Sequence, residues 1–257
     1  MPTVNLERRG ALALVELARP ESGNALSAGL VADLHAALAA AAESGARALI
    51  LAGSGRNFCA GADLRELAAT ADAPLAAHLA DANRLAATYA ALLRCPLLTV
   101  AAVHGAAYGG GAGLAAACDL VVASPAARFQ FSEVRLGFVP ALVSAFLPRR
   151  VAPATLARLL LDPEPLAAAA AREAGLVDEI ADDARAAAGE RALAIVRKAA
   201  PSALAETKRL LLAALLPQLD RRLAEAAEAN ARQRTHPDCR RGVAAFLASR
   251  EFPDWTA

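Results

Sequence analysis

The sequence has no long hydrophobic run and no excess of charge of one sign. Its longest alanine-rich stretches, such as residues 36–42, are far shorter than the roughly 20 apolar residues of a membrane-spanning helix, so we expect no span. The formal net charge is +1, and the arginines occur in pairs rather than in runs, which argues against a nucleic-acid-binding surface. A composition of 56% hydrophobic and 21% charged residues also excludes a disordered chain.

Cysteine is scarce as well. The four cysteines lie far apart and form neither a CxxC pair nor a dense framework, so we expect them to be reduced and structural. Residues 1–7 have neither a cationic start nor a following apolar core, and we therefore expect no secretory signal and a cytoplasmic location.

The 257 residues suffice for one large domain, or for one domain with a small appendage. Two alternating segments that meet at Gly10 predict a hairpin. Apolar runs and helical periodicities then alternate, which favours an α/β fold with a parallel component, and beyond Pro140 the pattern becomes almost entirely helical. The predicted strands cover residues 4–9, 11–17, 47–51, 97–103, 119–123, 128–131 and 177–180, and the predicted helices include 27–44, 75–93, 202–216 and 219–233.

Two segments join a predicted strand to a predicted helix through glycine-containing turns, residues 58–64 and residues 104–114. Free backbone N–H groups at a helix start can hold an anion, and glycines 109–111 allow a ligand to approach the backbone. No start within residues 105–116 satisfies the GxGxxG spacing of a dinucleotide site. Two such turns could instead direct two N–H donors at one carbonyl oxygen, as in an oxyanion hole.

At this point the chain resembles the crotonase superfamily, also called the enoyl-CoA hydratase/isomerase family, along nearly its full length. The matching segments, in order, are residues 20–26, 57–64, 104–111, 118–120, 131–137 with Pro140, and 174–177. The resemblance implies an α/β fold built as a spiral of ββα repeats with a helical C-terminal region. We expect residues 1–195 to form the core with the acyl-CoA site, and residues 196–257 to form a helical region that serves oligomerisation.

The resemblance also implies the residues of the site. Ala62 and Gly110 would donate the two oxyanion N–H groups, and Glu133 would transfer a proton. Arg65 is similar to a cation that meets a coenzyme A phosphate, although an exposed arginine on a helix can also be a simple solvated charge. The predicted substrate and coenzyme A contacts are Ala25, Leu26, Ala60, Asp63, Leu64, Arg65, Tyr108 and Gly109.

One position departs from the family pattern. Relatives that hydrate a double bond usually carry a second glutamate in the helix after the glycine turn, where this chain has Gly113. Glu133 follows an apolar segment, which predicts a desolvated carboxyl with a raised pKa; the alternative is a buried structural acid paired with Arg135 or another arginine. We expect His104 to be structural and Asp119 to cap a neighbouring element.

The implied function is that of an acyl-CoA enzyme of fatty acid metabolism, with hydration of a 2-enoyl-CoA as the leading interpretation. Three alternatives stay open: a 3-enoyl to 2-enoyl-CoA isomerase that uses one glutamate, an acyl-CoA decarboxylase, and a noncatalytic coenzyme A-binding scaffold. No metal and no cofactor beyond the coenzyme A of the substrate are expected. A homotrimer or homohexamer is expected, because the leucine stripe of Leu210, Leu211 and Leu215 exceeds what a small tail can bury alone.

Overall fold

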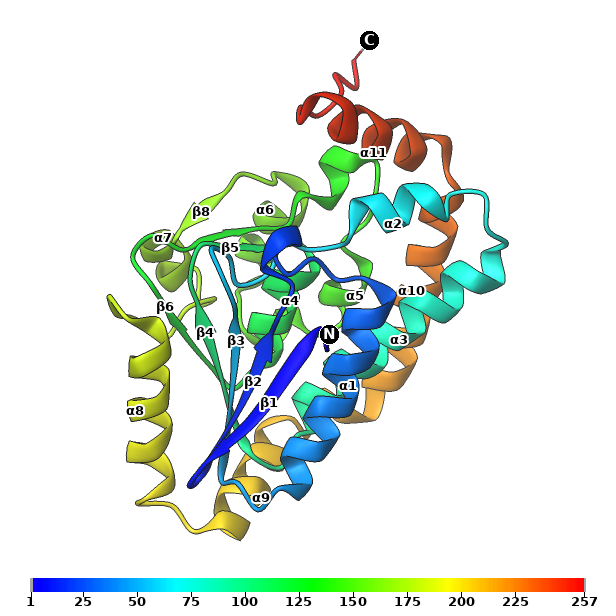
Figure 1. Cartoon of the computed structure of the whole chain (residues 1–257). Coiled ribbons are helices and arrows are strands. Elements are labelled where there is room, and N and C mark those ends of the chain that lie inside the picture. Colours follow the sequence, from blue (N-terminus) through cyan, green and yellow to red (C-terminus); the bar gives the residue numbers. More distant parts are fainter. Residues whose placement is uncertain (1, 257) are drawn as a thin grey trace.

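The computed structural model describes residues 2–256, and its centre is a six-stranded sheet (Figure 1). The strand order is β1-β2-β3-β4-β6-β9; β1 and β2 pair antiparallel, and every other neighbouring pair is parallel. The strands are β1 (Val4–Arg9), β2 (Leu12–Leu17), β3 (Ala48–Gly53), β4 (Leu98–Val103), β6 (Leu120–Ala123) and β9 (Glu179–Ile180).

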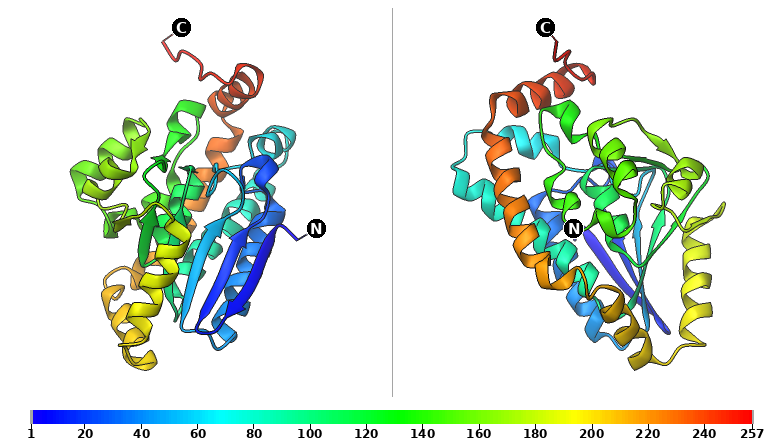
Figure 2. Two further views of the ribbon diagram at one scale, coloured as in Figure 1. Left: turned by 60° about the vertical axis from the view of Figure 1, so that its left-hand side comes forward. Right: turned by 180° about the vertical axis from the view of Figure 1, so that it is seen from behind.

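Helices cover both faces of this sheet, as the views in Figure 2 show. Helix α8 (Ala184–Val196) packs on one face, and the other face carries α1 (Ala28–Glu43), α3 (Leu75–Arg94), α4 (Gly110–Ala117) and α10 (Leu216–Thr235). Every residue of β3 and β4 is buried. Coverage on both faces explains why these strands are continuous apolar runs rather than alternating patterns.

A smaller sheet, ordered β5-β7-β8, lies beside the main one. Its strands are β5 (Ala106–Tyr108), β7 (Arg128–Gln130) and β8 (Leu166–Ala167). The remaining helices are α2 (Leu64–Ala69), α5 (Ala141–Ser144), α6 (Pro153–Leu161), α7 (Ala168–Glu173), α9 (Pro201–Leu211), α11 (Pro237–Ser249) and the 3₁₀ helices η1 (Pro20–Ser22), η2 (Ser132–Leu136) and η3 (Leu147–Arg149).

The α/β architecture and the hairpin predicted from the sequence are confirmed. The chain reverses at Gly10, whose φ of 60° lies in the left-handed region. Helix α1 begins where the sequence predicts, because the Ser27 Oγ accepts the N–H of Leu30 and so caps it. Strands β5 and β8 were not predicted: β5 lies within the glycine-containing segment 104–114, and β8 has two residues in a stretch that the sequence predicts as almost entirely helical.

The C-terminal region contains helices with different surroundings. Helix α10 packs along α3, and its Leu219 and Leu223 belong to the main core. Helix α9 instead leaves Leu210 57% and Leu211 80% exposed, whereas Leu215 packs against the core. Across residues 2–256, the structure contains no helix with the length and apolar character needed to cross a bilayer.

Candidate active site

The first predicted turn connects β3 to α2 and ends at Ala62. It needs glycine at Gly61, where φ is 93° and an added Cβ would lie 2.8 Å from the Tyr108 carbonyl oxygen. Asp63 follows as the N-cap of α2, because its Oδ1 accepts the N–H groups of Arg65 and Glu66. Ala62 is therefore the last residue before a capped helix start.

The second predicted turn connects β5 to α4 and lies directly beside the first. The Tyr108 N–H donates to the Cys59 carbonyl over 3.0 Å, and Cys59 also forms a bridge with Ala107, so the two segments run side by side. Gly109 has a φ of 49°, and Gly110 is the first residue of α4. The left-handed conformation at Gly109 is one that side chains rarely adopt.

These turns leave two backbone donors unused. Within residues 2–256, neither the Ala62 nor the Gly110 N–H donates a hydrogen bond to a protein acceptor. The first N–H groups of a helix lack intrahelical partners and lie at the positive end of its dipole, as at Gly110. The arrangement has the components of an oxyanion hole, with donors from two adjacent turns.

The carboxyl group of Glu133 lies against the second turn. It comes from η2, and its Oε1 would be 3.1 Å from a Cβ built on Gly109. Its Oε2 is buried and has no hydrogen-bond partner in the described chain. Burial raises the pKa of Glu133 to about 7, as the sequence predicts in direction, because a charged carboxylate is poorly solvated there. A carboxyl with this pKa can take up and release a proton near neutral pH.

The position of the missing second carboxylate is physically filled. A Cβ built on Gly113 would lie 2.6 Å from Val143 Cγ1 and 2.7 Å from the Tyr89 Oη. Both distances are too short for real contacts, so a side chain at position 113 would have to displace Val143 and Tyr89. At Gly113 the space is therefore taken by Val143 and the phenol of Tyr89.

Tyr89 also contacts the second turn directly. Its hydroxyl donates to the Gly110 carbonyl oxygen over 2.9 Å, and its ring packs on Phe146 at 5.1 Å between centroids. Burial, followed by the negative charge of Glu133, raises the pKa of Tyr89 well above its usual value. The phenol is therefore neutral and holds the first peptide of α4 in place.

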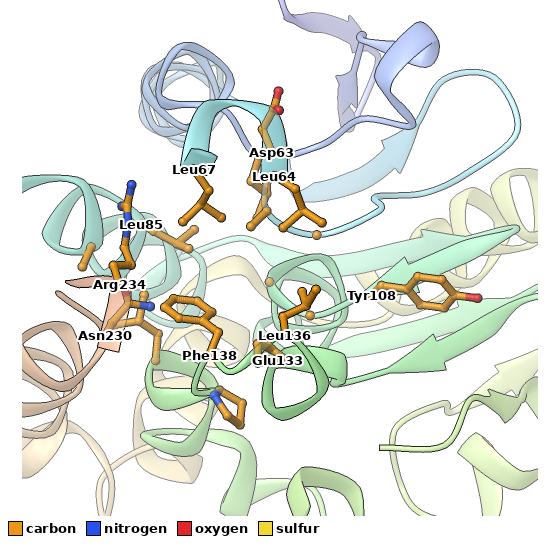
Figure 3. A pocket seen from close by; sticks show the side chains of 18 of the residues that line it. Asp63, Leu64, Leu67, Leu85, Tyr108, Glu133, Leu136, Phe138, Asn230 and Arg234 are labelled. Carbon is orange, nitrogen blue, oxygen red and sulfur yellow. The ribbon is translucent and has the colours of Figure 1, made fainter. Parts of the chain in front are cut away.

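The two turns and Glu133 open onto a cavity of about 340 Å³ (Figure 3). Its wall is largely apolar, with contributions from α1, α2, α3, α5 and the C-terminal helices. The predicted residues that line it are Leu26, Ala60, Ala62, Asp63, Leu64, Tyr108, Gly109, Gly110 and Glu133.

Two predicted contact residues lie outside this wall. Ala25 is buried next to it, and Arg65 is exposed on α2. Two acidic residues of the wall are already engaged: Asp63 accepts hydrogen bonds from Arg19, and Glu66 accepts the N–H of Ala28. In Figure 3 the ring of Tyr108 extends away from Glu133.

The residues for which the sequence left a structural role open now have partners. His104 Nε2 lies 2.9 Å from the Gly55 carbonyl oxygen. Asp119 Oδ2 accepts both the N–H and the hydroxyl of Thr99 and pairs with Lys208 at 2.7 Å, so it ties neighbouring strands together. Arg135 pairs with Glu164 at 3.8 Å rather than with Glu133.

Several cavity residues were missed by the sequence analysis. They come from α3, from the segment after η2, from the C-terminal helices and from the segment after α11, and no motif marks them because their role depends on tertiary packing. They include Leu85, Tyr89, Phe138, Asn230, Arg234, Phe246 and Phe252.

Comparison with known proteins identifies the family. The family model for enoyl-CoA hydratase/isomerase matches residues 7–257. A Thermus thermophilus protein named "Putative enoyl-CoA hydratase" is 40% identical over 244 residues, which is 94% of this chain and 96% of that protein. The chain belongs to the enoyl-CoA hydratase/isomerase family.

Solved structures of this family share the fold of the chain. An enoyl-CoA hydratase from Mycobacterium avium superposes with a TM-score of 0.86 at 32% identity and covers 98% of each chain. An enoyl-CoA hydratase/isomerase from Mycobacterium paratuberculosis superposes with a TM-score of 0.89 at 27% identity, covering 95% of this chain and 98% of that one. The predicted crotonase-like fold is confirmed.

Proposed function

We propose that the protein hydrates the double bond of a 2-enoyl-CoA thioester. One observation carries the proposal: a buried, unpaired carboxyl, Glu133, lies against the same turn that presents the Gly110 N–H, beside the free N–H of Ala62. The cavity that these groups share is apolar enough for an acyl chain. The names of the relatives support the same chemistry.

The reaction needs only one carboxylate in this scheme. The N–H groups of Ala62 and Gly110 hold the thioester oxygen and stabilise the negative charge that forms on it. Ionised Glu133 takes a proton from water as the water oxygen bonds to C3, and the electrons of the double bond move toward the thioester oxygen. The protonated Glu133 then returns that proton to C2, so that one water is added in total.

Coenzyme A binding is proposed at the edge of the cavity. Leu26 and Ala60 line the opening formed by the first turn, and Ala25 lies directly behind them. Arg65 is exposed on α2 and outside the acyl cavity, where it can meet a phosphate of the coenzyme A in solvent. An exposed ion pair of this kind contributes little energy, so Arg65 should affect KM more than kcat.

The filled space at Gly113, which leaves the site with one carboxylate, is compatible with the isomerase alternative as well as with hydration. Moving a proton from C2 to C4 of a 3-enoyl-CoA requires a single carboxylate and no water. Glu133 could perform that transfer against the same oxyanion donors, and the two activities are separated by the choice of substrate.

Turnover of crotonyl-CoA and of a 3-enoyl-CoA by the parent and by Glu133→Gln tests the proposal. We expect the parent to hydrate crotonyl-CoA and the variant to lose at least a hundredfold in kcat while still binding acyl-CoA, within the roughly 10² to 10⁴ contributed by a positioned acid or base. Isomerisation without hydration would favour the alternative. Binding without any turnover by the parent would leave the scaffold or decarboxylase interpretation.

The setting of the enzyme is also a proposal. We propose a cytoplasmic enzyme of fatty acid metabolism that assembles as a homotrimer or a homohexamer. The exposed Leu210 and Leu211 of α9 support an assembly, because a partner would remove their apolar surface from water. Light scattering should give a mass of three or six chains, and a stable monomer at micromolar concentration would contradict the assembly.

A further inference from the structure

A second cavity of about 270 Å³ adjoins the acyl cavity. The two cavities share four lining residues, Leu67, Arg234, Cys239 and Val243, so the second begins where the first ends. In Figure 3 Arg234 and Tyr108 lie toward opposite ends of the main cavity, with Glu133 between them. A chain that extends from Glu133 past Arg234 would reach the second cavity.

Arg234 stands between the two cavities with an unused donor. Its side chain is only 10% exposed. Its Nη1 pairs with Asp81 at 3.2 Å and its Nη2 donates to the Thr70 hydroxyl over 3.1 Å, but its Nε is buried without a partner. A buried donor that lacks an acceptor costs free energy, so a ligand that supplies an acceptor at this point would be stabilised.

His78 is a second buried polar residue, in the wall of the second cavity. The residue is 1% exposed, and both ring nitrogens are buried; the Ala73 carbonyl lies near the ring, but neither nitrogen has a partner in good hydrogen-bond geometry. Burial, and then the charge of Arg234, lower the pKa of His78, while Asp81 and the Ala73 backbone act in the opposite direction, so the ring is neutral and has one N–H. Arg240, a third polar residue of the wall, donates to the Asp72 carboxylate and to the Ala71 carbonyl.

The charges around this end favour an anion. No acidic side chain is among the described residues that line the second cavity. Asp81 is shared by Arg84 and Arg234, and Asp72 pairs with Arg240, so three arginines face two aspartates. A purely apolar ligand would leave the positive charge of this end without a partner, whereas a carboxylate matches that charge.

We infer that the second cavity binds a terminal carboxylate on the far end of the acyl group, so that the protein prefers coenzyme A thioesters of dicarboxylic acids. The inference rests on the proposed function for the placement of the acyl chain, and it names the substrate class of that site. The coenzyme A phosphates are a different source of negative charge, and a comparison of acyl groups on the same coenzyme A removes them from the result.

Binding of saturated acyl-CoA pairs tests the inference without turnover. Calorimetry would compare pentanoyl- with glutaryl-CoA, hexanoyl- with adipoyl-CoA, and octanoyl- with suberoyl-CoA. For at least one chain length, the thioester with the terminal carboxylate should bind roughly tenfold or more tightly, the range of charge-assisted hydrogen bonds.

Two variants locate the source of that preference. Arg234→Gln should reduce the affinity ratio severalfold, and His78→Leu should also reduce it while leaving the Arg234 to Asp81 pair intact. Arg232→Gln is the matched control, since Arg232 lies on the same helix but is exposed and pairs with Glu228. The control should keep the parental ratio.

The outcomes are distinct. A ratio near one at every chain length, or a high ratio that persists in folded Arg234→Gln and His78→Leu proteins, would overturn the inference. If Arg234→Gln fails to fold, His78→Leu decides. A preserved ratio in the parent without any hydration of enoyl-CoA would overturn the proposed function and leave this inference standing.

Discussion

Two glycines at the start of α4 face very different neighbours. At Gly109 the space beyond the backbone holds the carboxyl of Glu133, whereas at Gly113, one helical turn later, it holds the ring of Tyr89 and Val143. The side of α4 next to Glu133 is acidic and can exchange protons, whereas the side next to Tyr89 and Val143 is neutral and tightly packed. The comparison shows that the space at a position without the expected catalytic side chain can be filled by packed neighbours rather than left empty.

The neighbours of both glycines surround the point where the Ala62 and Gly110 N–H groups would hold the thioester oxygen. Removing one of these two N–H donors should therefore have the largest effect. Ala62→Pro removes the N–H and should lower kcat by about 10² to 10³, the usual cost of one oxyanion donor. Ala62→Ser keeps the N–H and should be far milder. Steady-state kinetics on crotonyl-CoA would measure both.

Proline also restricts the preceding residue, here Gly61, so the fold must be checked first. A circular dichroism spectrum that matches the parent is required before the rates are compared. A folded Ala62→Pro protein with near-parental activity would mean that the carbonyl is held elsewhere.

The acidic side can be tested through the pH dependence of stability. The pKa of Glu133 is raised from 4.5 to about 7, so the folded state binds a proton that the unfolded state has already released between these values. The parent should therefore lose stability as pH rises from 4 to 8, by about 3 kcal/mol at most relative to Glu133→Gln. Denaturant unfolding of the parent and of Glu133→Gln at pH 4 and pH 8 measures the change. If the difference in unfolding free energy between the two proteins is the same at both pH values, Glu133 is more solvated than the structure indicates.

The same titration bears on activity, because the proposed mechanism begins with an ionised Glu133. The kcat/KM of the parent should rise with pH through about 7. A flat profile over that range would argue against Glu133 as the base.

The packed side is tested by filling the space at Gly113. Gly113→Ala should destabilise the fold by about 1 to 3 kcal/mol, because overpacking against Val143 and Tyr89 exceeds the gain in helix propensity. Gly189→Ala is the control, since Gly189 lies inside α8 and its added Cβ would meet only Leu12 Cδ1 at 3.7 Å. That control should be neutral or stabilising, and equal effects of the two substitutions would contradict the packed wall.

The same contacts limit Gly113→Glu. A glutamate at this position needs the volume that Tyr89 and Val143 occupy, so it should not supply a second carboxylate in an otherwise unchanged site.

The contrast between the two sides also explains what the sequence could predict. Glu133 and the two turns lie in local patterns that combine glycine, a strand end and a helix start, and these patterns carry their own geometry. The ring that fills the space at Gly113 comes from α3, about 24 residues earlier in the chain, and nothing near residue 89 marks it as part of the site. Arg234 and His78 were missed for the same reason, because their positions depend on how α10, α11 and α3 pack together.

The smallest expected effect concerns the hydroxyl of Tyr89 alone. Tyr89→Phe keeps the ring but removes the hydroxyl, which both donates to the Gly110 carbonyl and is the part of Tyr89 nearest to Gly113; the loss of the hydrogen bond should cost about 1 kcal/mol in stability. The bond holds the Gly110–Gly111 peptide, which adjoins the peptide that carries the Gly110 N–H, so kcat should fall severalfold while KM for crotonyl-CoA stays close to the parental value. A decrease in stability with unchanged kcat would make Tyr89 a packing residue only. A loss of kcat as large as that of Glu133→Gln would mean that the phenol takes part in the proton transfer, so that both sides of α4 contribute to the chemistry.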